Sequence, residues 1–575
     1  MSAPLTDKLI SQRSPDEDAA LWARFRGALG RSVEADTGRW LKLMTGPVPD
    51  FDWSAFVHPS PTTQTRGEAL ANGIWRHGLE RYEAGPNALP WLFEGASHHF
   101  RDRIHRFDWL PDLAAEGGPA VETARWLVDA WIEEFGNFDG FAWRAGPTAD
   151  RVWNWMRCGS LLFDDPLESA VKLRLQALRR QVMHLDDLST TTDDIDARLR
   201  IGAVLTVLGV ISDQQDQVHI GLERLEGECT AQILPDGGHV GRSPSRVLRV
   251  MLDLVAVQDV LAKLNHPVPD FITKWVPRMG AMLNFFRCDD GGLLPFNDSS
   301  EGEPAQVEAA LARLDTRPRR FTFSPKSGFQ KLERGGLRLI LDVGAAPERP
   351  FGDMAHAGAL GFELADNASR LVTSCGFSRD VDLDWQAAVR RTGAHSTLVL
   401  GGRDNAGFVK HDATDLLMPV GPEGISAKRL EEEDEIWLDA QHSGYRDVFG
   451  LLHRRRLFMA GDGSRLAGED SLVRPVSKEP SPDARPIGFE VRFHLHPNVS
   501  AEMGRTSIRL ETESGAQWLF KTSHAGTRLE KSLYLARGSV EHPHQIVITG
   551  RADPNGDGQG PPNCVRWAFV REAVA

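Results

Sequence analysis

His356-Ala-Gly-Ala-Leu-Gly-Phe-Glu-Leu364, Arg370-Leu-Val-Thr-Ser-Cys-Gly376 and Arg391-Thr-Gly-Ala-His395-Ser-Thr-Leu-Val-Leu400 follow one another along the chain. The first and third pieces each carry a histidine at the leading end of a short apolar run, and such runs are typical of β-strands. Strands that are distant in a chain can become neighbours in a folded β-domain, so these two histidines can meet in space. The stretch therefore predicts a β-domain with a histidine pair at its strand ends.

The pattern from residue 305 onward alternates with a period of two. In 489–496, apolar residues alternate with Glu490, Arg492, His494 and His496, so the polar side chains share one face. Residues 518–521, 545–548 and 565–570 are predicted as further strands, and 461–464 and 513–516 as hairpin turns. Many short strands with glycine-rich turns predict an antiparallel β-sandwich.

The pattern before residue 305 is helical. Within 243–264, Ser243 is a good N-cap, Pro244 suits the first helical position, and apolar residues then recur at steps of three, four and seven. The same spacing predicts helices at 121–135, 152–163, 173–183 and 199–211. Amphipathic helices with short links favour antiparallel pairs. An α/α toroid, a bundle and a solenoid all satisfy this pattern.

The change of period divides the chain. We expect an N-terminal extension over 1–60, with one possible helix at 19–29, then a helical domain over 61–305 and a β-sandwich over 306–575. Residues 299–320, rich in Ser, Glu, Ala, Pro and Arg, are the expected linker.

Composition limits the classes of function. The chain has 575 residues and a net charge of −14, which argues against general nucleic-acid binding but not against an anionic ligand in a locally basic cleft. The five cysteines are scattered and form no CxxC pair, so neither a disulfide framework nor a zinc finger is expected. Sixteen tryptophans stand against three tyrosines, and tryptophans either fill helical cores or stack on sugar rings.

No targeting or spanning segment is visible in the sequence. The N-terminus lacks the apolar stretch of a secretory signal, and the chain contains no run of about 18 apolar residues. The sequence alone therefore predicts a soluble, cytoplasmic protein.

The order of these pieces resembles the heparinase II/III family of polysaccharide lyases. Further segments similar to the bacterial heparinase II/III-like subgroup are Phe107-Asp-Trp-Leu-Pro-Asp-Leu113, Asp236-Gly-Gly-His-Val-Gly-Arg-Ser-Pro244, Phe285-Phe-Arg-Cys-Asp-Asp-Gly-Gly292 and Tyr445-Arg-Asp-Val-Phe-Gly-Leu-Leu-His-Arg-Arg-Arg456. The resemblance covers roughly residues 100–575. It implies an incomplete α/α toroid followed by an antiparallel β-sandwich, β-elimination on an acidic, uronic-acid-containing polysaccharide, and a location in the periplasm or cell envelope.

Some family members hold a structural zinc with two histidines and an aspartate. The resemblance places His356 and His395 at the histidine positions, and Ser374 or Cys375 at the aspartate position. A thiolate at Cys375 is a sound substitute for a carboxylate, whereas a closed zinc site needs four ligands. The alternative is that both histidines are buried and hydrogen-bonded, or face the substrate. His356 is also a candidate catalytic residue.

Two positions depart from the family. Met354 stands where the family has a catalytic histidine, and Ser245 or Arg246 stands where it has a catalytic tyrosine. We expect first a lyase that uses other residues to cleave an acidic polysaccharide by β-elimination. The alternative is a glycan-binding protein of the same fold that has lost catalysis.

Residues before and within the helix at 243–264 are candidate replacements. His239 follows two glycines close to that helix's N-terminus and is a candidate acid or base, or else a loop histidine that caps a turn. Arg242 and Arg246 are candidates for binding a sugar carboxylate, or else part of a solvated basic face. Trp153 and Trp155 are candidate sugar platforms on a toroid helix, with core packing as the alternative.

The β-half offers a second set. Tyr445 is a candidate acid or base in place of the family's tyrosine, with His442 beside it as a substrate-binding residue, or else Tyr445 is an ordinary strand-edge aromatic. Arg454 and Arg456 share one face of a strand and either line the cleft or lie on a solvated sheet face. We expect His239 and Arg242 to face His356 and Tyr445 across the domain junction.

Overall fold

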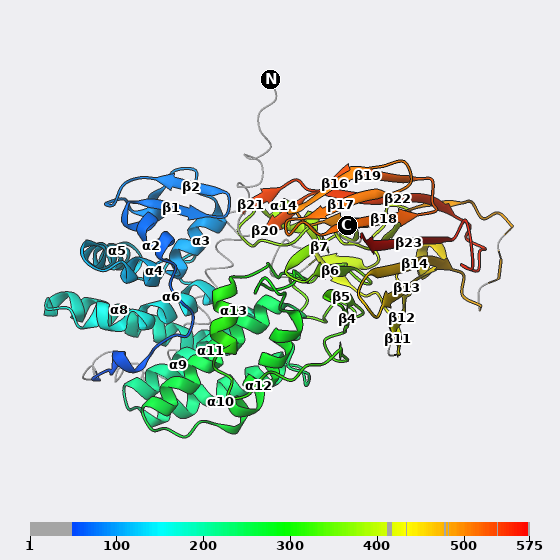
Figure 1. Cartoon of the computed structure of the whole chain (residues 1–575). Coiled ribbons are helices and arrows are strands. Elements are labelled where there is room, and N and C mark those ends of the chain that lie inside the picture. The colour runs from blue at the N-terminus through cyan, green and yellow to red at the C-terminus, as the bar shows by residue number, and fades with distance from the viewer. Residues whose placement is uncertain are drawn as a thin grey trace.

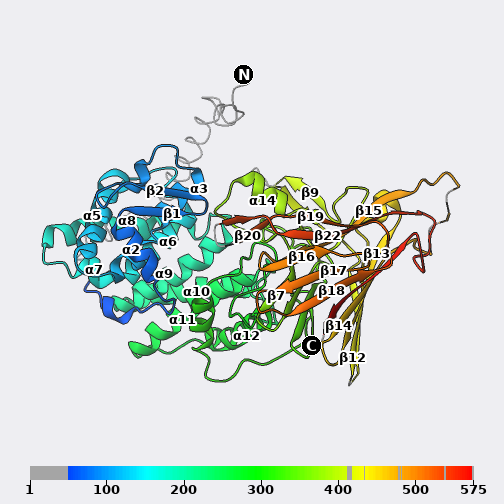
Figure 2. The ribbon, with the colours of Figure 1, turned by 45° about the horizontal axis from the view of Figure 1, so that its top comes forward.

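The computed structural model describes residues 49–410, 417–432, 434–476, 479–480, 482–536 and 539–572. A helical domain, from α2 to α13, is followed by a β-domain, from β3 to β23 (Figures 1 and 2). The predicted order, an incomplete α/α toroid and then an antiparallel β-sandwich, is confirmed. The possible helix at 19–29 lies outside the described residues.

The helices of the helical domain are mostly amphipathic and pack as neighbouring pairs. Their bounds are α2 (Gln64–Ala71), α3 (His98–Arg106), α4 (Leu110–Ala115), α5 (Pro119–Phe135), α6 (Ala145–Arg157), α7 (Gly159–Phe163), α8 (Glu168–Leu188), α9 (Ile195–Ile211), α10 (Gln215–Gln232), α11 (Pro244–Lys263), α12 (Asp270–Phe286) and α13 (Pro304–Leu311).

Local sequence explains several of these bounds. The Ser243 side chain accepts a hydrogen bond from the Arg246 amide and caps α11, as its sequence predicts. The helix expected at 152–163 is interrupted at Cys158, where α6 ends and α7 begins. The expected linker contains α13, whose Val307 and Ala310 are buried in the helical core. The described part of the chain has no helix long and apolar enough to cross a membrane.

One hairpin in the helical domain was not predicted. Strands β1 (Ile74–His77) and β2 (Glu80–Glu83) pair antiparallel around a turn at Gly78, whose φ is +56°. The four-residue strands are too short for a clear alternating pattern, which is why the sequence did not reveal them.

Two antiparallel sheets form the sandwich. The larger sheet has the order β19 (Thr527–Lys531), β22 (His544–Ala552), β15 (Ile487–Leu495), β7 (Ser369–Thr373), β6 (Phe362–Asp366), β5 (Leu337–Asp342), β4 (Phe329–Arg334) and β3 (Phe323–Ser324), and β8 (Leu398–Leu400) also pairs with β15. The facing sheet has the order β11 (Ser426–Glu431), β12 (Glu435–His442), β13 (Leu452–Ala460), β14 (Arg465–Val473), β23 (Cys564–Arg571), β18 (Gln517–Thr522), β17 (Ile508–Thr512) and β16 (Val499–Met503).

Smaller elements decorate the β-domain. They are the hairpins β9 (Gly407–Lys410) with β10 (Leu417–Val420) and β20 (Tyr534–Ala536) with β21 (Ser539–Glu541), and the helices α14 (Leu383–Val389) and α15 (Arg446–Phe449).

Separate apolar cores fill the two domains, and one of them crosses the junction. The core of the helical domain continues into the larger sheet through Phe329, Ile340 and Ala365. Phe329 packs against Phe286 of α12 and Phe296, with ring centroids 5.0 and 4.9 Å apart. This contact seats the larger sheet against the helices and fixes where a cleft between the domains can form.

Candidate functional site

A cleft of about 690 Å³ lies where α3, α6, α9 and α11 meet the segment 354–386 of the β-domain. Charged side chains dominate its lining. They are Arg103, Arg106, Arg144, Arg157, Arg200, Arg246, Arg249, Arg379, Asp102, Asp108, Asp150, Asp253, Asp298 and Asp380, with His58, His77, His98 and His99. A cleft so lined is suited to a charged, hydrophilic ligand.

Most of the cleft arginines are held by carboxylates. Arg106 donates at 2.6 Å to both Asp102 and Asp150, and Arg200 lies 2.8 Å from Asp253. The other paired arginines are Arg103, Arg144, Arg246, Arg249 and Arg379. Their charge is largely neutralised within the protein, so they offer little attraction to a ligand.

Arg157, the last residue of α6, differs from these arginines. Its guanidinium donates to two neutral acceptors, the side-chain oxygen of Asn154 at 3.3 Å and the backbone oxygen of Ser60 at 3.4 Å. Within the described ranges no carboxylate forms an ion pair with it. Burial lowers the pKa of Arg157 from its ordinary value, since its charge is poorly solvated. A ligand anion would supply the missing partner.

The acid–base groups in the cleft are histidines and one carboxyl, because burial raises the pKa of Asp253 to about 6 although the charge of Arg200 opposes it. Burial holds the pKa of His58 well below its ordinary value, and burial also lowers the pKa of His99. The three tyrosines of the chain, Tyr82, Tyr445 and Tyr534, are absent from the lining. Met354, which the resemblance places at the position of a family histidine, does line the cleft.

Ser245 and Arg246, one of which the resemblance places at the position of a family tyrosine, also line the cleft. The Ser245 hydroxyl accepts a hydrogen bond from Ser299 at 2.8 Å. Arg246 donates to Asp298 at 3.0 Å and to Asp353 at 3.1 Å. Arg246 is thus in the predicted place, and its Nε and Nη2 atoms are occupied by these carboxylates, whereas its Nη1 atom is buried without a partner among the described residues.

His239 does not face the cleft, and its predicted catalytic position is wrong in this respect. The side chain is completely buried. Its Nδ1 atom accepts a hydrogen bond from the Gly241 amide at 2.9 Å, and its Nε2 lies 3.1 Å from the Gln232 side-chain oxygen. Burial and the charge of Arg246 lower its pKa to about 3. These contacts fit a neutral histidine that holds the chain leading into α11.

Arg242 is also not a substrate ligand, because the β-domain occupies it. The guanidinium donates to the backbone oxygens of Ser327 at 2.8 Å and of Gly344 and Ala345 at 3.1 Å, and it pairs with Asp342. The side chain therefore anchors the helical domain to the larger sheet.

Tyr445 and His442 lie inside the sandwich and not at the junction. The Tyr445 hydroxyl donates to the Leu398 oxygen at 2.7 Å, and burial raises the pKa of this tyrosine. His442 accepts a hydrogen bond from the Gly444 amide at 3.0 Å and lies 3.2 Å from His453. Both side chains are buried, so the expectation that Tyr445 faces His239 across a cleft is not met.

Arg454 and Arg456 share a face of β13, as expected from their alternation. Arg454 donates to Asp439 at 2.7 Å, and Arg456 lies 3.3 Å from Glu469. Neither lines the junction cleft. Of the two alternatives that the sequence allowed for Arg454 and Arg456, the structure therefore matches the solvated sheet face.

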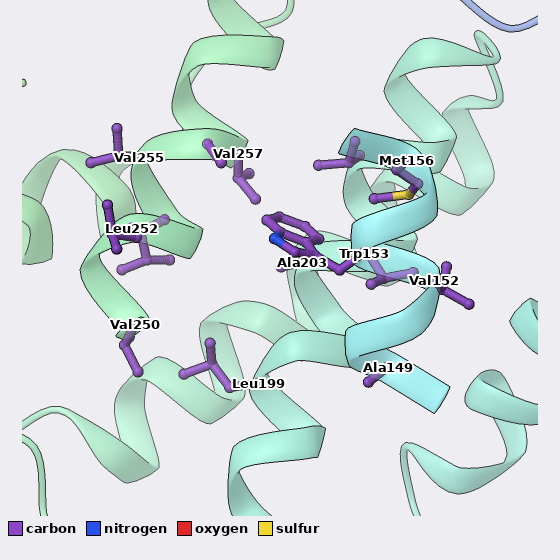
Figure 3. Close-up of a cluster of buried hydrophobic side chains, with 14 of the residues drawn as sticks. Ala149, Val152, Trp153, Met156, Leu199, Ala203, Val250, Leu252, Val255 and Val257 are labelled. Carbon is purple, nitrogen blue, oxygen red and sulfur yellow. The ribbon is translucent and has the colours of Figure 1, made fainter. Parts of the chain in front are cut away.

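Trp153 and Trp155 are core residues. Figure 3 shows Trp153 between α6 and α11, among Val152, Val257 and other apolar side chains. Trp153 is 1% exposed and Trp155 is 0% exposed, and the Arg200 guanidinium lies over the Trp153 ring at 4.9 Å. Both rings are packed in the core, which is the alternative that the sequence left open, although Trp153 is among the residues that line the cleft.

His356 and His395 do meet, with ring centroids 5.3 Å apart, beside a cavity of about 10 Å³. Both ring nitrogens of His356 and the Nε2 of His395 are buried without a hydrogen-bond partner. Burial holds the pKa of His356 well below its ordinary value and lowers that of His395 to about 4. The pair is buried and neutral, and a cavity of this size accommodates about one water molecule.

The remaining side chains do not complete a zinc site. The Cys375 thiol lies 3.6 Å from His494 and 4.0 Å from Ser532, and it does not line the cavity between the two histidines. The Ser374 hydroxyl donates to the Pro295 oxygen at 3.2 Å. Among the residues that the structure describes, no three His, Cys, Asp or Glu side chains are placed to hold a metal ion. The donor set therefore does not fit zinc.

This donor set gives a testable prediction. We expect zinc addition or EDTA dialysis to shift the Tm by less than about 1 °C, because only a metal that binds the folded state stabilises it. Thermal unfolding followed by circular dichroism is the measurement. A zinc-dependent rise in Tm that is lost in both His356→Ala and His395→Ala would contradict the assignment.

Sequence reasoning missed the residues that shape the cleft. Asn154 and Arg157 belong to α6, in which the sequence predicts only Trp153 and Trp155 as site residues. The signal that could have identified them is their spacing of three residues, which makes them neighbours on one face of a helix. His77 lies in the unpredicted hairpin, with its Nε2 atom 2.8 Å from Asp380 of the β-domain. No feature of local spacing connects two residues so far apart in sequence.

The comparisons with known proteins agree with this architecture. A family model described as Heparinase II/III-like, C-terminal matches residues 316–568. The FtsZ-localized protein C of Caulobacter vibrioides (strain NA1000 / CB15N) is 28% identical over 564 residues, which cover 96% of each chain.

Solved structures share the fold at low identity. A crystal structure of heparinase III matches with a TM-score of 0.65 and 13% identity, over 99% of this chain and 94% of that one. Heparan sulfate lyase HepC from Pedobacter heparinus matches with a TM-score of 0.54 and 15% identity, over 98% and 92%. The C-terminal part of the chain thus matches the heparinase II/III-like family model, and the fold along nearly the whole chain is that of the solved heparinase III structure.

Proposed function

We propose that the junction cleft binds an anionic saccharide, such as an oligosaccharide that contains uronic acid, without cleaving it. The observation that carries this proposal is Arg157, the cleft arginine for which the described residues supply no carboxylate partner. Asn154 beside it is engaged within the protein, since its oxygen accepts from Arg157 and its amide nitrogen donates to the Arg106 oxygen at 3.0 Å. His58 adds an imidazole that is neutral at physiological pH. An anion would pair with Arg157, and a hydroxyl group on the same ligand would hydrogen-bond to His58.

The cleft lacks the usual machinery for elimination. Expelling the 4-linked sugar requires a base for the C5 proton and an acid for the leaving oxygen. Met354 and Ser245 line the cleft at positions where the resemblance places the family's histidine and tyrosine, and both lack a group that titrates near neutral pH. These residues favour the non-catalytic alternative over the lyase.

The first experiment separates binding from cleavage. Purified protein is incubated with a panel of uronans, and the ultraviolet absorbance of unsaturated uronate is followed while binding is measured by calorimetry. We expect binding to one member and no absorbance change. Unsaturated product from the wild type, absent in a heat-inactivated control, would show that the protein is a lyase and would reject binding without cleavage.

Arg157→Ala tests the residue that carries the proposal. We expect affinity to fall about 10- to 100-fold, because a hydrogen bond to a charged group contributes about 1.5–3 kcal/mol. Arg144→Ala is the matched control, since Arg144 also lines the cleft but is paired with Asp102. It should cost less than about 5-fold. Equal losses in the two variants would mean that general charge, and not Arg157, attracts the ligand.

A second role is supported by the curated relative. The Caulobacter protein is named for its localisation with FtsZ, and it aligns with 96% of this chain at 28% identity, against 13–15% for the two lyase structures. We propose that this chain also assembles with FtsZ. Co-sedimentation with FtsZ polymers should enrich it in the pellet, and recovery equal to that of an unrelated control protein would reject this role.

A further inference from the structure

Two consecutive residues of the β-domain, Arg379 and Asp380, reach the helical domain in different places. The Arg379 guanidinium pairs with Asp298 and lies 3.5 Å from Asp196, which is in the first turn of α9. The Asp380 carboxylate lies 2.8 Å from Nε2 of His77, at the end of β1. Because adjacent residues are fixed to separate parts of the helical domain, the backbone between them lies across the gap between the domains.

The contact with the hairpin is tight. A Cβ atom added at Gly78 would lie 2.1 Å from the backbone oxygen of Asp380, so the hairpin turn and the β-domain backbone touch. Gly78 also has a φ of +56°, which glycine adopts without strain. No sugar ring fits between two backbones packed this closely.

Charge reinforces the contact at neutral pH. Burial alone would raise the pKa of Asp380, but the hydrogen bond from His77 and the charge of Arg103 outweigh it, and the pKa is lowered. Asp380 is therefore ionised at neutral pH, and a hydrogen bond to an ionised acceptor is stronger than a neutral one.

The cleft also has a limited volume. Its 690 Å³ falls within the range of about 300–1,000 Å³ that is typical of pockets for small ligands. A site for the interior of a polymer must be open at both ends, so that the chain can continue in each direction. Arg379, Asp380 and His77 of the hairpin line the cleft, so the bridge that they form between the domains bounds it on one side.

We infer that the cleft is closed at one end and takes the terminal sugars of an anionic saccharide, not the interior of a polysaccharide. This inference rests on the proposed function, because it concerns the same ligand and the same cleft. It limits the substrate class to chain ends and short oligosaccharides.

Binding stoichiometry across a length series tests this inference. Short, medium and long size fractions of one uronan that binds are titrated by calorimetry or sedimentation. A cleft that takes chain ends binds one protein per chain at every length. A number of bound proteins that grows with chain length would overturn the inference and leave the proposed function standing. Failure of every length to bind would overturn both.

Variants test whether the named residues form the closed end. Replacing both anchors, Arg379→Ala with Asp380→Ala, should let the chain pass and make the number of bound proteins rise with chain length. Asp384→Ala is the matched control, because Asp384 is exposed on α14 and outside the cleft lining. It should keep one protein per chain.

His77→Ala removes the pairing with Asp380 from the side of the helical domain. It is the variant to use if the double variant does not fold. Circular dichroism checks that each variant is folded. A folded double variant that still binds one protein per chain would show that these residues do not close the cleft.

Discussion

Replacing Arg242 by alanine is expected to lower the free energy of unfolding by about 3–5 kcal/mol, because it breaks a buried ion pair. The guanidinium joins the helical domain to Asp342 and to the backbone oxygens of Ser327 and Gly344. Without it, Asp342 would be a buried carboxyl with no cation, and burial already raises its pKa. We also expect the two domains to unfold separately, since this contact joins them.

Urea unfolding measures this effect when far-ultraviolet circular dichroism is compared with tryptophan fluorescence. The two probes should coincide for the wild type and diverge for Arg242→Ala. Arg242→Lys should recover only part of the loss, because an ammonium keeps the charge but not the fork of donors. Arg278→Ala, at an exposed position on α12, is the control and should change little. A single unchanged transition in Arg242→Ala would show that the anchor contributes little to stability.

The order of the domains could be predicted because helices and strands differ in the spacing of their apolar residues along the chain. Apolar spacing marks α11, and the Ser243 cap marks where that helix begins. Glycine-rich turns mark the hairpins of the sandwich, as between β13 and β14 at Gly461. These signals act over a few residues and do not depend on the rest of the fold.

The site could not be predicted in the same way. Arg242 and Arg246 are four residues apart, yet one enters the β-domain and the other lines the cleft. The reason is that Arg242 has a φ of +56° and precedes the helix, whereas Arg246 lies within it. The spacing of residues along a helix face therefore does not predict the contacts of Arg242 or of Arg246. Those contacts depend on how the two domains pack against each other.

Residue type was also a poor guide to exposure. Tyr445 and His239 have side chains suited to proton transfer, but both are buried and hydrogen-bonded within their own domains. Arg157 carries no distinctive signal in the sequence, because an arginine at a helix end is commonplace. Its interest is that the described residues supply no carboxylate partner, which only the folded structure reveals.

Several buried histidines make the protein sensitive to acid, and His105, His239 and His494 show the cause. His105 accepts a hydrogen bond from the Trp131 ring N–H at 3.0 Å, and His239 accepts one from the Gly241 amide. His494 lies 2.7 Å from the Ser532 hydroxyl and 3.0 Å from the Gly393 oxygen. Each ring is thereby fitted as a neutral tautomer. Burial lowers the pKa from 6.5 to about 4 for His105 and to about 3 for His239 and His494.

The sign of the effect follows from proton binding. Below pH 6.5 the unfolded chain takes up protons that these folded histidines do not, so stability falls as pH falls. Between pH 7.5 and 5.5 each histidine should cost about 1.4 kcal/mol, or about 4 kcal/mol together, against a typical total of about 5–15 kcal/mol. Urea unfolding at the two pH values measures this loss.

Histidine variants identify the source of that loss. His239→Gln should remove about 1.4 kcal/mol of the pH dependence, since one such group no longer titrates. His219→Gln, at an exposed position on α10, should leave it unchanged. Equal stability at the two pH values would mean that these rings bind protons in the folded state. That outcome is incompatible with their buried, neutral hydrogen bonding, because protonation of the accepting nitrogen must break the bond that it receives.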